Sequence, residues 1–121
     1  MIAGSFYLDE EYHNILIPEV MRTSNPFERM RGLLGRSPLG NHQALLIKPC
    51  SSIHTFFMSC ALDLVFLDEN WRIYKLVPAI KPWRMSWAPG AAMVLEMPAG
   101  SMENMSLAPG QTLYWKEREV L

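Results

Sequence analysis

Short apolar runs, separated by small residues, prolines or charged turns, recur along most of the chain. Many of these runs are rich in β-branched and aromatic side chains, a pattern typical of β-strands. A polar turn at 9–14 separates the first two runs, and the acidic turn at 68–70 predicts a hairpin. The strands are expected at 3–8, 15–20, 44–48, 53–58, 64–67, 72–77, 93–97 and 112–116.

One segment follows a helical pattern instead. Residues 25–28 form a helix start, in which the asparagine caps the helix, the proline takes the first helical position and the glutamate can close a capping box. The helix is expected to end near Leu34, with Gly35 as its left-handed terminator. Its apolar face would carry Phe27, Met30, Leu33 and Leu34. A short turn or helix is expected across 101–105.

Many short strands, nine prolines, seven glycines and one helix imply a mainly β (α+β) fold. We expect a small antiparallel barrel or sandwich, with the early helix covering an open edge or end. No repeat, low-complexity tract or linker divides the 121 residues, so residues 1–121 are expected to form a single domain.

The charge pattern narrows the classes of partner. Eleven Lys and Arg balance twelve Asp and Glu without any run of like charge, which argues against a nucleic-acid partner. No apolar run approaches the roughly twenty residues of a membrane span, so membrane insertion is not expected. The first eight residues lack the basic region of a signal peptide, and a cytoplasmic location is therefore expected.

The two cysteines are expected to be free thiols. Cys50 and Cys60 would lie about 30 Å apart if the chain between them were extended. A disulfide requires Cα atoms within about 7 Å, and no sharp reversal is evident between them. Free thiols fit a reducing compartment.

Residues 50–60 concentrate nucleophiles, an imidazole and sulfur ligands. Catalysis by a cysteine requires a base within hydrogen-bond reach, but Cys60 would lie about 20 Å from His54 along a straight strand. Cys50 approaches His54 only if the two intervening serines form a turn. A Cu(I) site built from His54, Met58 and Cys50 lacks any Cys-x-x-Cys or His-x-x-x-His pair, and methionines commonly fill cores. We therefore expect no metal and no cofactor.

His54 itself has two interpretations. It is either fixed by hydrogen bonds within the sheet, for example to Asp63, or part of a binding site in an open pocket. Between Ser37 and Leu62 the only charged residue is Lys48, which predicts a buried central strand pair that contains this imidazole.

The proline-rich stretch at 77–90 is the second candidate site. It carries Trp83, Arg84, Met85 and Trp87 on what is expected to be a stiffened loop. Two indoles and a guanidinium can stack on a planar or sugar-like ligand, or anchor a protein partner. The alternative is that the loop folds over the end of a barrel and buries its tryptophans in the core.

Four blocks of the sequence, at 31–36, 52–58, 62–68 and 94–100, resemble the domain-of-unknown-function family 192 in order and spacing. The resemblance covers about residues 17–113. It implies a small, mainly β fold with one early helix, and no established enzymatic activity or cofactor. The chain departs from the family pattern at Ala61, where relatives often have proline, and at Gln111, where they often have aspartate.

The family signature is carried here by residues of the helix end, the histidine block and the later strands. Two arginines of the signature, Arg31 and Arg36, can reach carboxylates such as Glu96 or Asp63, so much of the signature is interpreted as a structural network. The signature residues interpreted in this way are Arg31, Gly32, Gly35, Arg36, Asp68, Glu96 and Gly100.

The leading hypothesis is a non-enzymatic binding or accessory module, with a site near the strand that contains the histidine. Its ligand is an unidentified small molecule or protein. The candidate binding residues are His54, Phe57, Met58, Asp63, Trp83, Arg84 and Trp87. The alternatives are an enzyme of unknown class that uses His54 with Asp63 or a cysteine, and a structural protein that associates with itself.

Overall fold

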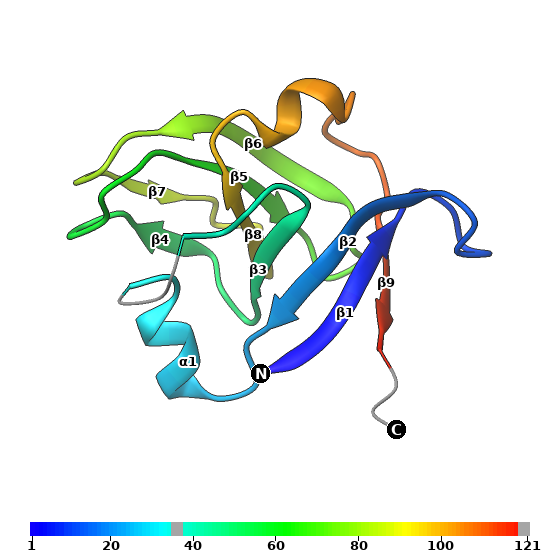
Figure 1. The fold of residues 1–121 in the computed structure, drawn as a ribbon, viewed down its shortest axis with the longest axis horizontal. Coiled ribbons are helices and arrows are strands. Elements are labelled where there is room, and N and C mark those ends of the chain that lie inside the picture. The colour runs from blue at the N-terminus through cyan, green and yellow to red at the C-terminus, as the bar shows by residue number, and fades with distance from the viewer. Residues whose placement is uncertain (35–37, 119–121) are drawn as a thin grey trace.

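The computed structural model describes residues 1–34 and 38–118 (Figure 1). Within them, seven strands form one sheet in the order β6-β5-β8-β3-β2-β1-β9, and β4 and β7 form a separate pair. The strands of the large sheet are β1 (Ile2–Tyr7), β2 (Ile15–Arg22), β3 (Gln43–Ile47), β5 (Leu62–Leu67), β6 (Ile73–Ile80), β8 (Met93–Pro98) and β9 (Tyr114–Glu117). The remaining elements are α1 (Pro26–Arg31), β4 (Ser52–His54), β7 (Met85–Trp87) and a 3-10 helix, η1 (Ser101–Asn104).

The predicted mainly β fold with one early helix is confirmed, but the sheet is mixed rather than purely antiparallel. β2 and β3 are parallel, with Val20 opposite Ala44. The crossover between these strands includes α1 and is long enough to bring the chain back to the same end of the sheet, which parallel pairing requires.

The sheet does not close into a barrel, because β6 and β9 remain its two edges. Backbone contacts nevertheless join the start of β6 to the segment that precedes β9. Arg72 forms an isolated bridge with Thr112, and the Ile73 N–H donates to the Gln111 carbonyl at 2.8 Å. The curled sheet therefore encloses one of its two faces.

Apolar side chains cover both faces of the sheet, because β5 and β8 are buried on each side. The enclosed face holds the cluster Phe6, Ile17, Val20, Ala44, Leu46, Val65, Leu67, Ile73, Met93, Leu95, Met97 and Leu113. The other face holds Leu33, Leu45, Ile47, Leu62, Leu64, Phe66, Ile80, Ala88 and Val94. Residues next to β4 and α1 pack over this second face.

The helix begins where the sequence predicts and ends earlier. Asn25 caps it by accepting from the Glu28 N–H at 2.9 Å, whereas the Glu28 carboxylate accepts from the Ser24 N–H at 2.8 Å. The helix stops at Arg31 because Gly32 adopts a φ of +54°, so the expected end near Leu34 is wrong. The expected apolar face is also wrong in part: Leu33 is buried, but Phe27 and Met30 are exposed. Gly35 lies outside the described residues.

The predicted strand at 53–58 is wrong beyond His54. Thr55 is buried, and its hydroxyl donates to the Lys81 carbonyl at 2.6 Å and accepts from the Arg84 N–H at 2.9 Å. These bonds hold a turn in which Phe57 has a φ of +66°. The strand is therefore short and peripheral, and His54 is exposed rather than part of a buried central pair.

The stretch at 77–90 is more ordered than the expected loop. It contains the end of β6 and all of β7, whose Met85 lies opposite His54 and whose Trp87 lies opposite Ser52. The turn that joins β6 to β7 projects from one end of the molecule (Figure 1). None of the helices in the described part of the chain has the length and apolar character to cross a membrane.

Candidate functional site

A pocket of about 330 Å³ lies between the end of α1 and β4, on the second face of the large sheet. We call it the α1–β4 pocket. Its lining joins several candidate residues from the histidine block to several signature residues. The lining residues are Arg29, Met30, Arg31, Gly32, Leu33, Leu34, Ile47, Cys50, Ser52, Ile53, His54, Phe56, Met58 and Glu96.

Glu96 is the unusual residue of this pocket. It lies on β8 between Leu45 of β3 and Leu64 of β5, and only 5% of its surface is exposed. Burial of the charged form raises the pKa of its carboxyl from 4.5 to about 7. Among the described residues, this carboxyl has no hydrogen-bond or ion-pair partner. The pocket therefore contains a buried acidic group that makes no hydrogen bond or ion pair with the described residues.

Two arginines of α1 stand in the wall of the same pocket. Arg29 is half-buried, and no carboxylate of the described residues lies within 4.0 Å of its guanidinium. Arg31 donates from Nε to the Leu34 carbonyl at 3.0 Å, which turns the chain after the helix. The predicted ion pair between Arg31 and Glu96 does not occur in the described part of the chain. The pocket thus contains charges of both signs.

Cys50 also lines the pocket, but as a thiol that donates to the Ser52 carbonyl at 2.9 Å. Burial raises the pKa of this thiol, so the thiolate that would act as a nucleophile is disfavoured at neutral pH. Cys60 is exposed and is not among the lining residues. Both cysteines are free. Cys50 is therefore part of the pocket wall and is not placed as an activated nucleophile.

His54 and three aromatic rings form a continuous group at the edge of the pocket. The His54 ring stacks on Phe56 with centroids 4.8 Å apart, and Phe56 stacks on Trp83 at 5.9 Å. Phe57 meets the same indole edge-on at 4.7 Å. Nδ1 of His54 accepts from the Phe56 N–H at 3.2 Å, which leaves Nε2 for an external partner.

The predicted binding residues that do not line the pocket include Phe57, Trp83, Arg84 and Trp87. Trp83 and Trp87 are 56% and 59% exposed, so these tryptophans are not core residues. Arg84 is exposed, and its backbone N–H bonds to Thr55. Phe57 projects with 71% of its surface exposed, whereas Met58 faces the pocket.

Asp63 lies on the opposite face of the sheet from Glu96, because it is paired with Met97 and Glu96 is paired with Leu64. Its two oxygens accept from the Ala79 N–H at 2.8 Å and the Met102 N–H at 2.9 Å. Asp63 therefore fixes the end of β6 to η1, and the structure does not bring it together with His54.

Two remaining signature residues shape turns outside the α1–β4 pocket. Asp68 accepts from the Asn70 N–H at 2.8 Å and the Arg72 N–H at 3.0 Å, which closes the turn between β5 and β6. Gly100 caps η1 with a φ of +93°. Arg36, like Gly35, lies outside the described residues.

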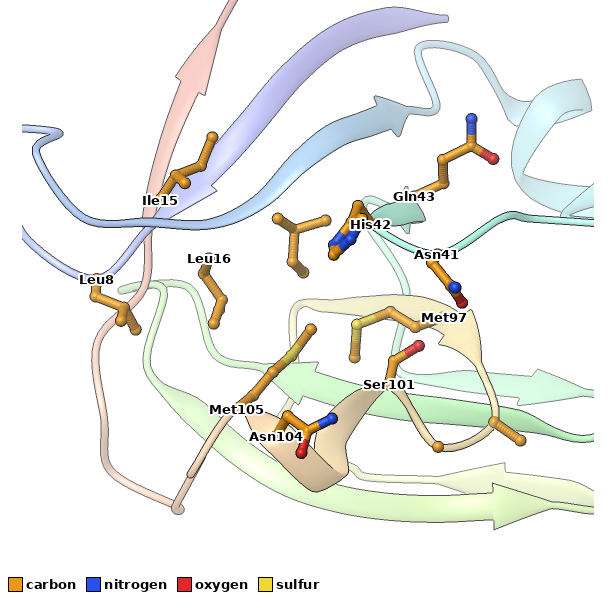
Figure 2. A pocket seen from close by; sticks show the side chains of 13 residues that line it. Leu8, Ile15, Leu16, Asn41, His42, Gln43, Met97, Ser101, Asn104 and Met105 are labelled. Carbon is orange, nitrogen blue, oxygen red and sulfur yellow. The ribbon is translucent and has the colours of Figure 1, made fainter.

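A second and larger pocket, of about 580 Å³, opens between β2 and η1 (Figure 2). Met97 and Met105 point into it, with Leu16 on the side of β2 and Asn104 on the side of η1. None of its described lining residues is Asp, Glu, Lys or Arg. Some of its polar groups are also engaged: Ser101 donates to the Pro98 carbonyl at 2.6 Å, for example. This pocket is large, but it lacks the charged side chains that would orient a ligand.

No group of three or more His, Cys, Asp or Glu side chains within residues 1–34 and 38–118 is arranged to hold a metal ion. The side chains of Cys50, His54 and Met58 all line the α1–β4 pocket.

Sequence reasoning interpreted Glu96 as structural and did not weigh Arg29 as a site residue. A signal for Glu96 was present, because Val94, Leu95 and Met97 make this strand apolar on both faces. An acidic residue in such a strand has no solvent face and must be buried. The position of Arg29 depends on where the fold places α1 relative to β4, which no local pattern encodes.

Comparison with known proteins supports the family resemblance. The pattern of the DUF192 family, described as "Uncharacterized ACR", matches residues 9–115. A UPF0127 protein of Thermococcus sibiricus is 33% identical over 100 residues, which are 77% of this chain and 63% of the relative. The chain thus spans less than two thirds of that relative's length. The UPF0127 protein PF1050 of Pyrococcus furiosus is 32% identical over 104 residues, covering 80% of this chain and 86% of the relative.

Two crystal structures share the fold. A Sinorhizobium meliloti 1021 protein, described as a candidate transcription regulator, matches with a TM-score of 0.79 at 18% identity, over 95% of this chain and 94% of that one. A protein of unknown function from Novosphingobium aromaticivorans DSM 12444 matches with a TM-score of 0.71 at 21% identity, over 93% and 84%. At these identities the likeness concerns the fold alone. On the extent of the family match, the chain belongs to the DUF192 family.

Proposed function

We propose that this chain is a binding module that holds a small molecule in the α1–β4 pocket, with Glu96 as the anchoring group. The observation that carries the proposal is the Glu96 carboxyl, which is buried without a partner among the described residues. Perturbed acidic groups in a cleft are typical of functional sites.

The cost of this burial supports a functional reason for the residue. The pKa of the carboxyl is 4.5 in the unfolded chain and about 7 in the folded one. Above pH 7 this difference lowers the free energy of unfolding by roughly 3 kcal/mol. A leucine or glutamine at this position would avoid most of that cost. A ligand that donates hydrogen bonds to the carboxyl offsets this cost, and the interaction contributes to the affinity of the ligand.

The walls of the pocket suit a small molecule. Ile47, Leu33 and Met58 supply apolar surface, and the stacked rings of His54 and Phe56 supply a flat aromatic border. A pocket of about 330 Å³ is at the lower end of the range for small-molecule sites. Trp83 and Phe57 continue this aromatic surface beyond the pocket.

A thermal-shift screen tests the proposal. A panel of metabolites, including amino acids, amines, organic acids, sugars and nucleotides, is applied to the wild type, to Glu96→Gln and to Glu103→Gln. Glu103 is the matched control because it is an exposed glutamate on η1. We expect at least one compound to raise the melting temperature of the wild type and of Glu103→Gln, but not that of Glu96→Gln. Equal stabilisation of all three proteins, or no stabiliser in the panel, would overturn the proposal.

A further inference from the structure

We propose that the ligand of the α1–β4 pocket is a small zwitterion, whose ammonium group binds Glu96 and whose carboxylate or other anionic group binds Arg29. This inference rests on the proposed function and adds the chemical class of the ligand. It depends on two charged groups of opposite sign that share one pocket.

The two groups do not neutralise each other. Arg29 and Glu96 both line the pocket, yet no ion pair joins them within 4.0 Å. Both act electrostatically on the Cys50 thiol, which lines the same pocket: Glu96 raises its pKa and Arg29 lowers it. The Arg29 guanidinium and the Glu96 carboxyl therefore line one pocket without forming an ion pair.

A cationic group is the partner that the Glu96 site favours. An ammonium beside a buried carboxylate supplies both the opposite charge and N–H donors, which favours the ionised form that burial penalises. The described residues around Glu96 supply no such donor. Gly32, where an added Cβ would lie 3.6 Å from Oε1 of Glu96, has no side chain.

An anionic group is the partner that Arg29 favours. A guanidinium pairs with a carboxylate through two parallel hydrogen bonds, and this guanidinium has no such partner among the described residues. The Arg29 guanidinium would repel a ligand that carried only an ammonium group. Glu96 would likewise repel a ligand that carried only an anion. A zwitterion satisfies both groups at once.

The volume sets the size of the ligand. About 330 Å³ corresponds to roughly ten water molecules at about 30 Å³ each, so the pocket accommodates a molecule of about amino-acid size. The apolar side chains of the lining suit a short methylene chain that joins the two ends of the ligand.

The test uses ω-amino acids of increasing length, from glycine through 4-aminobutyrate to 6-aminohexanoate, because this series varies the separation of the charges. Butylamine and butyrate are the controls that carry only one of the two charges. Affinity is measured by isothermal titration calorimetry. We expect one chain length to bind at least about tenfold more tightly than either control.

Variants assign the two ends of the ligand. Glu96→Gln and Arg29→Gln should each weaken the preferred amino acid by about tenfold or more, and Arg29→Lys should restore part of the loss. Arg118→Gln, at an exposed arginine outside the pocket, should leave the affinity unchanged. Butylamine binding as tightly as the amino acids, or unchanged affinity in Arg29→Gln, would overturn the inference.

This outcome is distinguishable from failure of the proposed function. If compounds of another class stabilise the wild type but not Glu96→Gln, while no amino acid of the series binds, the pocket is a binding site and the zwitterion assignment is wrong. If no compound of the wider panel depends on Glu96, the proposed function itself is wrong.

Discussion

Gly32 lies against the carboxyl of Glu96: a Cβ added at position 32 would be 3.6 Å from Oε1 and 3.8 Å from Cδ1 of Ile47. The absence of a side chain here, together with a φ of +54°, ends α1 and leaves the carboxyl open to the pocket. This contact links the end of the helix to the buried strand β8.

Gly32→Ala is therefore expected to impair both stability and ligand access. A backbone with positive φ and a ψ of −128° is strained for alanine, by about 1–3 kcal/mol. Chemical denaturation should show this loss, and the added methyl group should weaken any ligand that contacts Glu96. Gly40→Ala is the control, because Gly40 is exposed and is not among the positive-φ glycines. Equal stability of the two variants would contradict this account of Gly32.

Glu96→Gln is expected to stabilise the protein in a pH-dependent way. The wild-type carboxyl has a pKa of about 7 when folded and 4.5 when unfolded, so the unfolded chain binds fewer protons between these values. The contribution of this group to stability is therefore full below pH 4.5 and is lost as the pH rises to about 7. Cys50, His54, Arg29 and Arg31 face the same pocket and are retained in the variant.

The measurement is the free energy of unfolding from pH 5 to pH 8. The variant should gain up to roughly 3 kcal/mol on the wild type over this range, and little of the gain should be present at pH 5. Glu103→Gln, at an exposed position, should follow the wild-type curve. Parallel curves for Glu96→Gln and the wild type would show that Glu96 is not a buried, unpartnered carboxyl.

Asp63→Ala is expected to be destabilising, because Asp63 is buried and its loss leaves the partly buried N–H groups of Ala79 and Met102 without this acceptor. Each unsatisfied group costs about 1–3 kcal/mol. Asp68→Ala is a matched control, since Asp68 also accepts from two backbone N–H groups, but in a turn that water can reach. Denaturation midpoints that fall equally in both variants would contradict the structural role assigned to Asp63.

His54→Ala is expected to leave the melting temperature nearly unchanged while weakening the ligand found by screening. The ring is exposed, and the only hydrogen bond found for it among the described residues is the one its Nδ1 accepts from the Phe56 N–H. A drop of several degrees would instead assign the residue a structural role.

The parts of the fold that were predictable are those set by neighbouring residues. The helix start at Asn25 and the β5–β6 hairpin follow from capping and turn chemistry that a few residues contain. The turn after His54 was not predictable, because Thr55 is held by bonds to Lys81 and Arg84, far along the chain. The parallel pairing of β2 with β3 depends on a long crossover in the same way.

Only part of the candidate site was predictable, because the rest depends on contacts between distant parts of the chain. His54, Met58 and Glu96 were recognisable as unusual residues, but their meeting in one pocket depends on strand order and on how α1 packs. From the sequence alone, Asp63 is a candidate binding residue and Glu96 is interpreted as structural. The register of β5 against β8 places the two carboxyls on opposite faces, which separates their roles.

Both proposals require that the α1–β4 pocket is the binding site. The most direct test of this requirement is a titration of the ¹⁵N-labelled protein with the strongest stabiliser from the screen, followed by amide chemical shifts. We expect the largest shifts on Gly32, Cys50, His54 and Glu96. Shifts centred instead on His42, Ser101 and Asn104 would place the ligand in the pocket between β2 and η1 and contradict the account.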